Sequence, residues 1–124
     1  MWDGFNQRKF PRLSLKCEVR LNPEDSSRVI HATTENVGVG GICLLQDQAL
    51  DRFSKCQIIL ELSKEHPKIQ CEGKVCWIIP HSKPLSKTTQ YDTGIEFVGM
   101  KAETRDVLRQ FIEDLQSRGF KDIA

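Results

Sequence analysis

The sequence predicts a mainly β protein: a six-stranded antiparallel β-barrel with one C-terminal α-helix packed against it. Apolar and polar residues alternate strictly over residues 13–22, and short apolar runs recur between polar loops up to residue 98. A helical spacing of apolar residues begins only after residue 102. The chain has 124 residues, a common size for one domain, so we expect a single hydrophobic core.

The first two strands are predicted from alternation and from β-branched residues. Every second residue is apolar over residues 13–21, which is typical of a half-buried strand. The polar stretch 22–26 predicts a loop. A second strand is expected over residues 28–35, where Thr33 and Thr34 favour extended backbone.

Four more strands are expected after a glycine cluster at residues 38–41. Trp77 shares the parity of the apolar residues Ile69 and Val75, so we expect it in the core or at the barrel rim. Gly94 interrupts the last strand. The predicted segments are strands at 42–45, 56–62, 68–79 and 91–98, a short helical or irregular bridge at 47–54, and a loop at 80–90.

The end of the chain changes to a helical period. A helix is predicted over about residues 102–118, with Gly119 as the residue that ends it. Its apolar residues recur every three to four positions and therefore form one face, which we expect to pack against the barrel. They are Val107, Leu108, Phe111, Ile112 and Leu115.

Charge and cysteine content narrow the class of protein. The net charge is +1, from 18 basic and 17 acidic residues, which argues against non-specific binding of DNA or RNA. Residues 1–16 nevertheless hold four basic residues and one acidic residue, so this segment can attract anions. The five cysteines, without a signal-peptide pattern or an apolar run near 20 residues, favour a reduced, cytoplasmic protein with no membrane span.

Two arginines near the N-terminus form the first candidate binding motif. Pro11 lies between Arg8 and Arg12 and disfavours a helix, so the two α-carbons are expected about 12 Å apart on extended backbone. Such a pair can clamp a phosphate or a guanine edge. A basic tail that never orders is an equally good interpretation of this segment alone. Arg105 and Arg109 share the spacing, but on the predicted helix they indicate only a solvated face.

Residues 36–41 form the second candidate motif. The three glycines Gly38, Gly40 and Gly41 leave backbone N–H groups open to a ligand. Asn36 can both donate and accept in one plane, which suits a base edge. A plain glycine-rich turn capped by Asn36 is the alternative. A phosphate-binding P-loop is excluded because no Gly-Lys-Ser/Thr follows, and a dinucleotide-binding turn because no helix pattern begins here.

The order of these features resembles the PilZ domain family, whose members are bacterial receptors for cyclic di-GMP. The resemblance covers essentially the whole chain, and residues 73–77 and 94–97 are similar to the family's last barrel strands. The family's motifs are Arg-x-x-x-Arg and Asp/Asn-x-Ser-x-x-Gly. They are matched here by Arg8, Arg12, Asn36 and Gly41, while Gly38 stands in place of the serine.

The resemblance implies a non-enzymatic cyclic di-GMP receptor with a PilZ-like barrel. A flexible arm at residues 1–12 is expected to order on binding, to close on the domain at 13–124, and to signal to a protein partner. Gln7, Lys9 and Trp77 are possible further ligand contacts. Loss of the serine hydroxyl at Gly38 predicts binding weakened roughly threefold to tenfold. The alternative is a PilZ-like adaptor that no longer binds the ligand.

Other chemistries find less support. A zinc site is disfavoured because no Cys-x-x-Cys occurs and because Cys71 and Cys76 would lie on opposite faces of one strand. Nothing in the sequence places a base beside a cysteine nucleophile. A barrel for single-stranded nucleic acid would need more stacking aromatics. We therefore expect no metal and no cofactor, and the number of bound ligands stays open.

Overall fold

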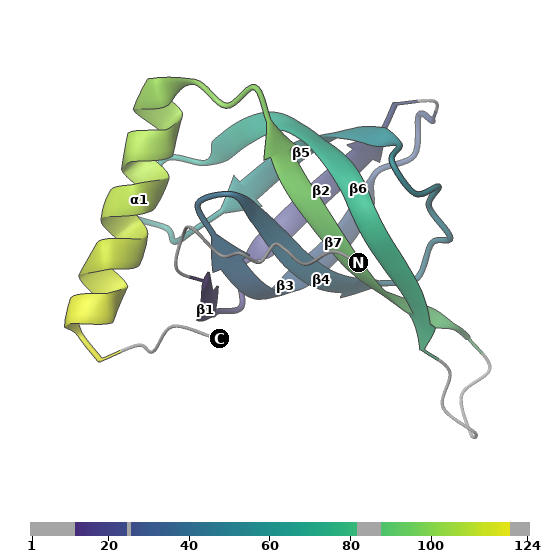
Figure 1. Cartoon of the computed structure of the whole chain (residues 1–124), viewed down its shortest axis with the longest axis horizontal. Coiled ribbons are helices and arrows are strands. Elements are labelled where there is room, and N and C mark those ends of the chain that lie inside the picture. The colour runs from purple at the N-terminus through teal and green to yellow at the C-terminus, as the bar shows by residue number, and fades with distance from the viewer. Residues whose placement is uncertain (1–11, 25, 82–87, 120–124) are drawn as a thin grey trace.

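A computed structural model describes residues 12–24, 26–81 and 88–119 of the chain. It is an antiparallel barrel with one helix across one end (Figure 1). The strands are β1 (Arg12–Ser14), β2 (Glu18–Pro23), β3 (Ile30–Gly38), β4 (Gly41–Gln46), β5 (Lys55–Glu61), β6 (Ile69–His81) and β7 (Gln90–Val98), and the helix is α1 (Ala102–Ser117).

The sheet closes on itself. Its strand order is β1-β3-β2-β5-β6-β7-β4, and an additional β3–β4 pairing joins the two sides. β1 pairs with residues 36–38 of β3, and β2 pairs with residues 30–33 of the same strand. Because β1 and β2 lie end to end along β3, they occupy one position in the barrel. The predicted six-stranded barrel with a C-terminal helix is confirmed.

The strand predicted over residues 13–21 is interrupted, which the alternation did not indicate. The break lies between β1 and β2, and the buried side chain of Thr34 fills it. The Cys17 N–H donates to Thr34 Oγ1 at 2.8 Å, and this hydroxyl donates to the carbonyl of Leu15 at 2.7 Å. These bonds satisfy backbone groups that the missing ladder would leave unpaired.

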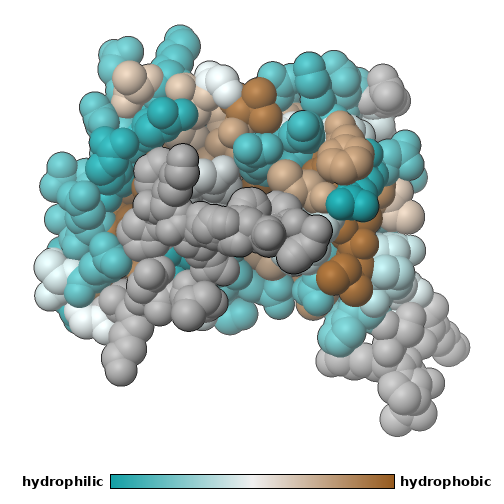
Figure 2. Space-filling model, viewed as in Figure 1, coloured by the Kyte–Doolittle hydropathy of each residue, from teal (hydrophilic) through white to brown (hydrophobic). Residues whose placement is uncertain are grey.

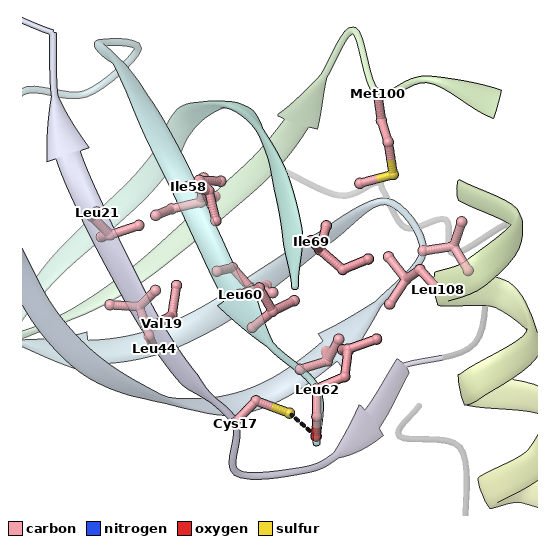
Figure 3. Packing of buried hydrophobic residues seen from close by; sticks show 14 of the residues in the cluster. Cys17, Val19, Leu21, Leu44, Ile58, Leu60, Leu62, Ile69, Met100 and Leu108 are labelled. Atoms are coloured by element: carbon pink, nitrogen blue, oxygen red, sulfur yellow. Dashed lines mark hydrogen bonds between the residues drawn. The ribbon is translucent and has the colours of Figure 1, made fainter. Parts of the chain in front are cut away.

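The core fills the barrel and extends under the helix. Leu108 and Ile112 of α1 are fully buried, and Figure 3 shows Leu108 pointing towards Ile69 and Met100. The loop before β6 also contacts the helix, since the rings of His66 and Phe111 meet edge to face at 4.9 Å. The predicted amphipathic helix is thus confirmed, and its apolar face closes one end of the barrel.

The structure settles two connections that were predicted only approximately. Residues 47–54 are irregular and end in a turn at residues 51–54, so of the two alternatives predicted for this bridge the irregular one is confirmed. β6 continues to His81 and pairs there with Gln90, so the strands around the predicted 80–90 loop are longer than expected.

α1 has 16 residues, and the described part of the chain contains no helix long and apolar enough to cross a membrane.

Candidate ligand-binding face

Five residues from five strands line up across the outside of the barrel. Ser14 pairs with Asn36, Asn36 with Cys43, Cys43 with Gly94, and Gly94 with Trp77. Their sequence neighbours Leu13, Val37, Ile42 and Ile95 point into the core, so these five lie on the opposite, outer face. We call this set the outer row. Figure 2 shows brown apolar and teal polar atoms interspersed on the face turned to the viewer.

A β-bulge brings Asn36 into the outer row. Thr34 pairs with Leu44 and is buried, so simple alternation would also turn Asn36 inward. The register of β3 and β4 shifts between Thr34 and Asn36, which makes Glu35 the extra residue. Val37 therefore points into the core, and Asn36 points out.

A second bulge does the same for Trp77. Val75 is fully buried opposite Ile95, and the register shifts at Cys76 before Trp77 pairs with Gly94. Trp77 has the sequence parity of Ile69 and Val75, but the extra residue reverses the alternation, so the core position that this parity predicted is wrong. Trp77 is half-buried on the outer face, and Ile79 beyond it is 55% exposed.

The indole of Trp77 lies directly against Gly94. A Cβ built on Gly94 would stand 2.3 Å from both Cε2 and Nε1 of Trp77. No side chain fits at that distance, so the glycine is required for the position of the indole. An isolated glycine within a predicted strand was the one signal in the sequence for this close approach.

The two candidate motifs meet through their side chains. Arg12 Nη2 donates a hydrogen bond of 2.7 Å to Asn36 Oδ1. Gly38 is the residue directly opposite Arg12, and Asn36 is its diagonal neighbour, within reach of a long side chain. Because the Asn36 oxygen accepts from Arg12, the Asn36 amide nitrogen presents donors to a ligand.

Gly41 has a packing role. It pairs with Glu96 at the start of β4, and a Cβ on Gly41 would lie 2.3 Å from the carbonyl oxygen of Ile95. The Phe97 N–H donates to the Gly40 carbonyl at 2.9 Å and continues the contact between the hairpin and β7. None of Gly38, Gly40 and Gly41 has a left-handed backbone, so close approach rather than turn geometry requires the glycine at 41.

The surroundings of Cys43 in the outer row keep its thiol protonated. Burial, assisted by the nearby Glu35 and Asp92, raises the pKa of Cys43 to about 12, although Arg12 acts in the opposite direction. Burial also raises the pKa of the other four cysteines, including Cys76 at the second bulge. A reactive thiolate at neutral pH is therefore not favoured at any cysteine.

Three of the predicted ligand contacts belong to the segment before β1. Gln7, Arg8 and Lys9 lie outside the described residues. Within residues 12–24, 26–81 and 88–119, no group of three or more His, Cys, Asp or Glu side chains could hold a metal ion. The structure thus brings together Arg12, Asn36 and Gly38 at one end of the outer row and places Trp77 at the other.

The described residues thus form a closed antiparallel barrel with a C-terminal helix and with a row of polar and aromatic residues on its outer face. Residues 6–114 match the family model described as the PilZ domain. The chain therefore belongs to the PilZ domain family. A search of curated protein sequences gives no match.

Solved structures agree on the fold. The inhibitor of motility MotI/DgrA of Bacillus subtilis has a TM-score of 0.74 at 21% identity, over 92% of this chain and 53% of that one. The PilZ domain of YcgR from Escherichia coli with c-di-GMP has a TM-score of 0.71 at 14% identity, over 91% and 94%. The K. pneumonia MrkH–c-di-GMP complex has a TM-score of 0.74 at 15% identity, over 91% and 53%. The chain spans about half the length of MotI and MrkH.

Proposed function

We propose that this PilZ domain is a non-enzymatic receptor for cyclic di-GMP. The observation that carries the proposal is the 2.7 Å hydrogen bond between Arg12 and Asn36, at one end of an outer row that has Trp77 at its other end. A guanidinium, an amide and an indole are the groups that bind phosphates, base edges and base faces, respectively. Two solved structures of the same fold, the PilZ domain of YcgR and MrkH, carry this ligand, which supports the proposal.

Each side chain has a defined task in the proposed complex. The Arg12 guanidinium forks onto a phosphate or onto the O6/N7 edge of a guanine. The Asn36 amide nitrogen donates to an acceptor on the same ligand. Trp77 provides an apolar surface on which a base stacks, worth roughly 1–3 kcal/mol per base. Gly41 keeps the β3–β4 hairpin close to β7 and so supports the surface on which the ligand lies.

The segment before β1 completes the proposed site. Arg8 adds the second guanidinium, with Lys9 and Gln7 as further contacts, and ligand binding orders this segment against the barrel. The cost of ordering this arm is met by the charge-assisted contacts that the arm then makes. A protein partner that recognises the ordered arm would receive the signal as a shift in population.

The raised pKa values of the cysteines support a binding role without catalysis, because no thiol is activated as a nucleophile. All five cysteines are free, as is typical of the reducing cytoplasm. We therefore infer a cytoplasmic receptor that uses no metal or cofactor. MrkH, one of the similar structures, is a transcription regulatory factor, so titration with duplex DNA is a second test, in which we expect no binding.

The direct test is calorimetric titration with cyclic di-GMP. We expect saturable binding that Arg12→Ala weakens at least tenfold, with a similar loss for Arg8→Ala. Arg105→Ala is the matched control, since Arg105 is exposed on α1, and it should bind as the wild type does. Absence of saturable binding at tens of micromolar, or an equal loss in the control, would refute the proposal.

The second candidate is a PilZ adaptor that works without cyclic di-GMP. It is favoured by one observation: Gly38, opposite Arg12, has no hydroxyl at the serine position of the family motif. If the site is only weakened, Gly38→Ser should tighten binding about threefold to tenfold, the worth of one neutral hydrogen bond. Gly40→Ser, on the exposed turn two residues later, is the control. Wild-type and Gly38→Ser proteins that both fail to bind would favour the adaptor.

A further inference from the structure

A second surface lies beside the outer row, at the turn between β4 and β5. Phe53 in this turn is 59% exposed and has a left-handed backbone, with a φ of 69°. It is the one non-glycine residue with positive φ among residues 12–24, 26–81 and 88–119. A bulky residue is disfavoured in that conformation, and an exposed aromatic ring adds little to the hydrophobic core. A glycine at position 53 would avoid both the disfavoured backbone conformation and the exposed ring.

Two cations lie over the ring of this phenylalanine, and a third lies beside one of them. The Arg52 guanidinium lies 4.7 Å and the Lys74 ammonium 5.7 Å from the centroid of the Phe53 ring. Lys55 on β5 pairs directly with Lys74 on β6, which places two like charges side by side on the outer face. Among the described residues, none of these three cations has a carboxylate within ion-pair distance.

The surface is held firmly to the barrel. The Phe53 N–H donates to the Val75 carbonyl at 2.6 Å, and the Val75 N–H donates to the Ser54 carbonyl at 2.9 Å. Arg52 Nε donates to the Cys76 carbonyl at 3.1 Å. The turn is therefore built as a rigid support, which lowers the entropy cost of binding a partner through Phe53.

We propose that Arg52, Phe53, Lys55 and Lys74 form a docking surface for an acidic protein segment. Such a segment places an apolar side chain on the Phe53 ring and carboxylates beside the cations. The charges are complementary: Lys55 and Lys74 face each other, and although Glu96 lies opposite Lys74 on its other side, the three cations of the surface outnumber the two carboxylates beside it. Asp51 and Glu96 border the surface and limit the number of carboxylates that it accepts.

The topology and charge argue against other kinds of partner. β5 and β6 are each paired on both sides within the barrel, so a partner cannot add a strand here and must contact side chains. A nucleic acid would need a longer basic surface and more than one stacking aromatic. The proposal is independent of cyclic di-GMP, since it uses none of the residues assigned to that ligand.

The probe is a displayed library of random linear peptides, selected on the full chain without cyclic di-GMP. We expect the selected peptides to combine Asp or Glu with Leu, Ile or Phe. Phe53→Gly and Lys74→Glu should each weaken the selected peptides at least tenfold. Phe53→Gly relieves the left-handed backbone, and its thermal unfolding should show that it stays folded. Val29→Gly, which removes a side chain 45% exposed elsewhere, is the control and should leave binding unchanged.

Three results would overturn the proposal. The first is a selection with no acidic and apolar pattern, and the second is selected peptides that bind Phe53→Gly as well as the wild type. The third is loss of self-association or of oligonucleotide binding in Phe53→Gly without loss of peptide binding, which would assign the surface to another occupant. A failed cyclic di-GMP titration bears on the proposed receptor function and leaves this test unaffected.

Discussion

Arg12 Nη2 donates a hydrogen bond of 2.7 Å to Asn36 Oδ1, and so two residues 24 positions apart form one polar site. The bond depends on the pairing of β1 with the end of β3, which places Asn36 diagonally opposite Arg12. Because Asn36 already orients the guanidinium, less of its rotamer freedom remains to be lost when a ligand binds. The two motifs are therefore coupled before any ligand arrives.

Asn36→Ala should weaken cyclic di-GMP binding about tenfold. The change removes the amide donor and also the acceptor that orients Arg12, together worth roughly 1–2 kcal/mol. Calorimetric titration measures the effect. Asn22→Ala, on the exposed side of β2, is the matched control and should bind normally. An Asn36→Ala protein with wild-type affinity would separate Asn36 from the ligand.

Gly94→Ala should displace the indole of Trp77 and reduce ligand affinity. The added methyl group would lie 2.3 Å from the indole, which must move because the backbone of β7 is paired on both sides. We expect a stability loss of about 1 kcal/mol, since the half-buried ring can turn towards solvent. Tryptophan fluorescence in a Trp2→Phe background reports the movement, and calorimetry reports the affinity.

A variant that combines Trp77→Leu with Gly94→Ala tests whether Gly94 acts on the ligand through Trp77. If Trp77 contacts the ligand, Trp77→Leu alone should weaken binding, and adding Gly94→Ala should weaken it little further, because both changes remove the same contact. Additive losses would mean that Gly94 acts on the site by a route other than Trp77.

Thr34→Val should lower the free energy of unfolding by roughly 1–3 kcal/mol. The hydroxyl is buried, accepts from the Cys17 N–H and donates to the Leu15 carbonyl, so its removal leaves two backbone groups unpaired. Urea denaturation measures the change. Thr33→Val, on the exposed face of the same strand, should be close to neutral. Equal effects at the two positions would mean that Thr34 does not bridge the break between β1 and β2.

Alkaline pH should destabilise the protein through its buried thiols. The pKa of Cys43 is about 12 in the folded protein against an ordinary value of 9.0, so the unfolded chain ionises first. The contribution of this thiol to stability is complete below pH 9 and is lost as pH rises towards 12. Within that window the Cys43 thiol lowers the free energy of unfolding by ~1.4 kcal/mol per pH unit.

Cys43→Ala should therefore flatten the decline of stability above pH 9, as measured by urea denaturation at a series of pH values. Cys76→Ala is the comparison, because Cys76 is half-buried and should make a smaller difference. An unchanged slope in Cys43→Ala would show that the Cys43 thiol ionises as readily in the folded protein as in the unfolded one.

Local patterns in the sequence were sufficient to predict most of the fold. The alternation from Leu13 to Leu21, the later apolar runs and the helical spacing around Leu108 each depend on neighbours in sequence, so they predicted the barrel and its helix. The break at residues 15–17 was missed because it depends on Thr34, a residue of another strand that hydrogen-bonds across it.

The candidate ligand-binding face could likewise be predicted only in part from the sequence. The sequence by itself determined which residues are candidates, since Arg12, Asn36 and Trp77 have recognisable chemistry and the first two stand in motifs similar to those of PilZ domains. Only the tertiary structure decided which way two of them point. One extra residue at Glu35 and another at Cys76 reverse the parity of their strands and turn Asn36 and Trp77 outward. A bulge is defined by the partner strand that it fails to match, so no pattern within a single strand indicates it.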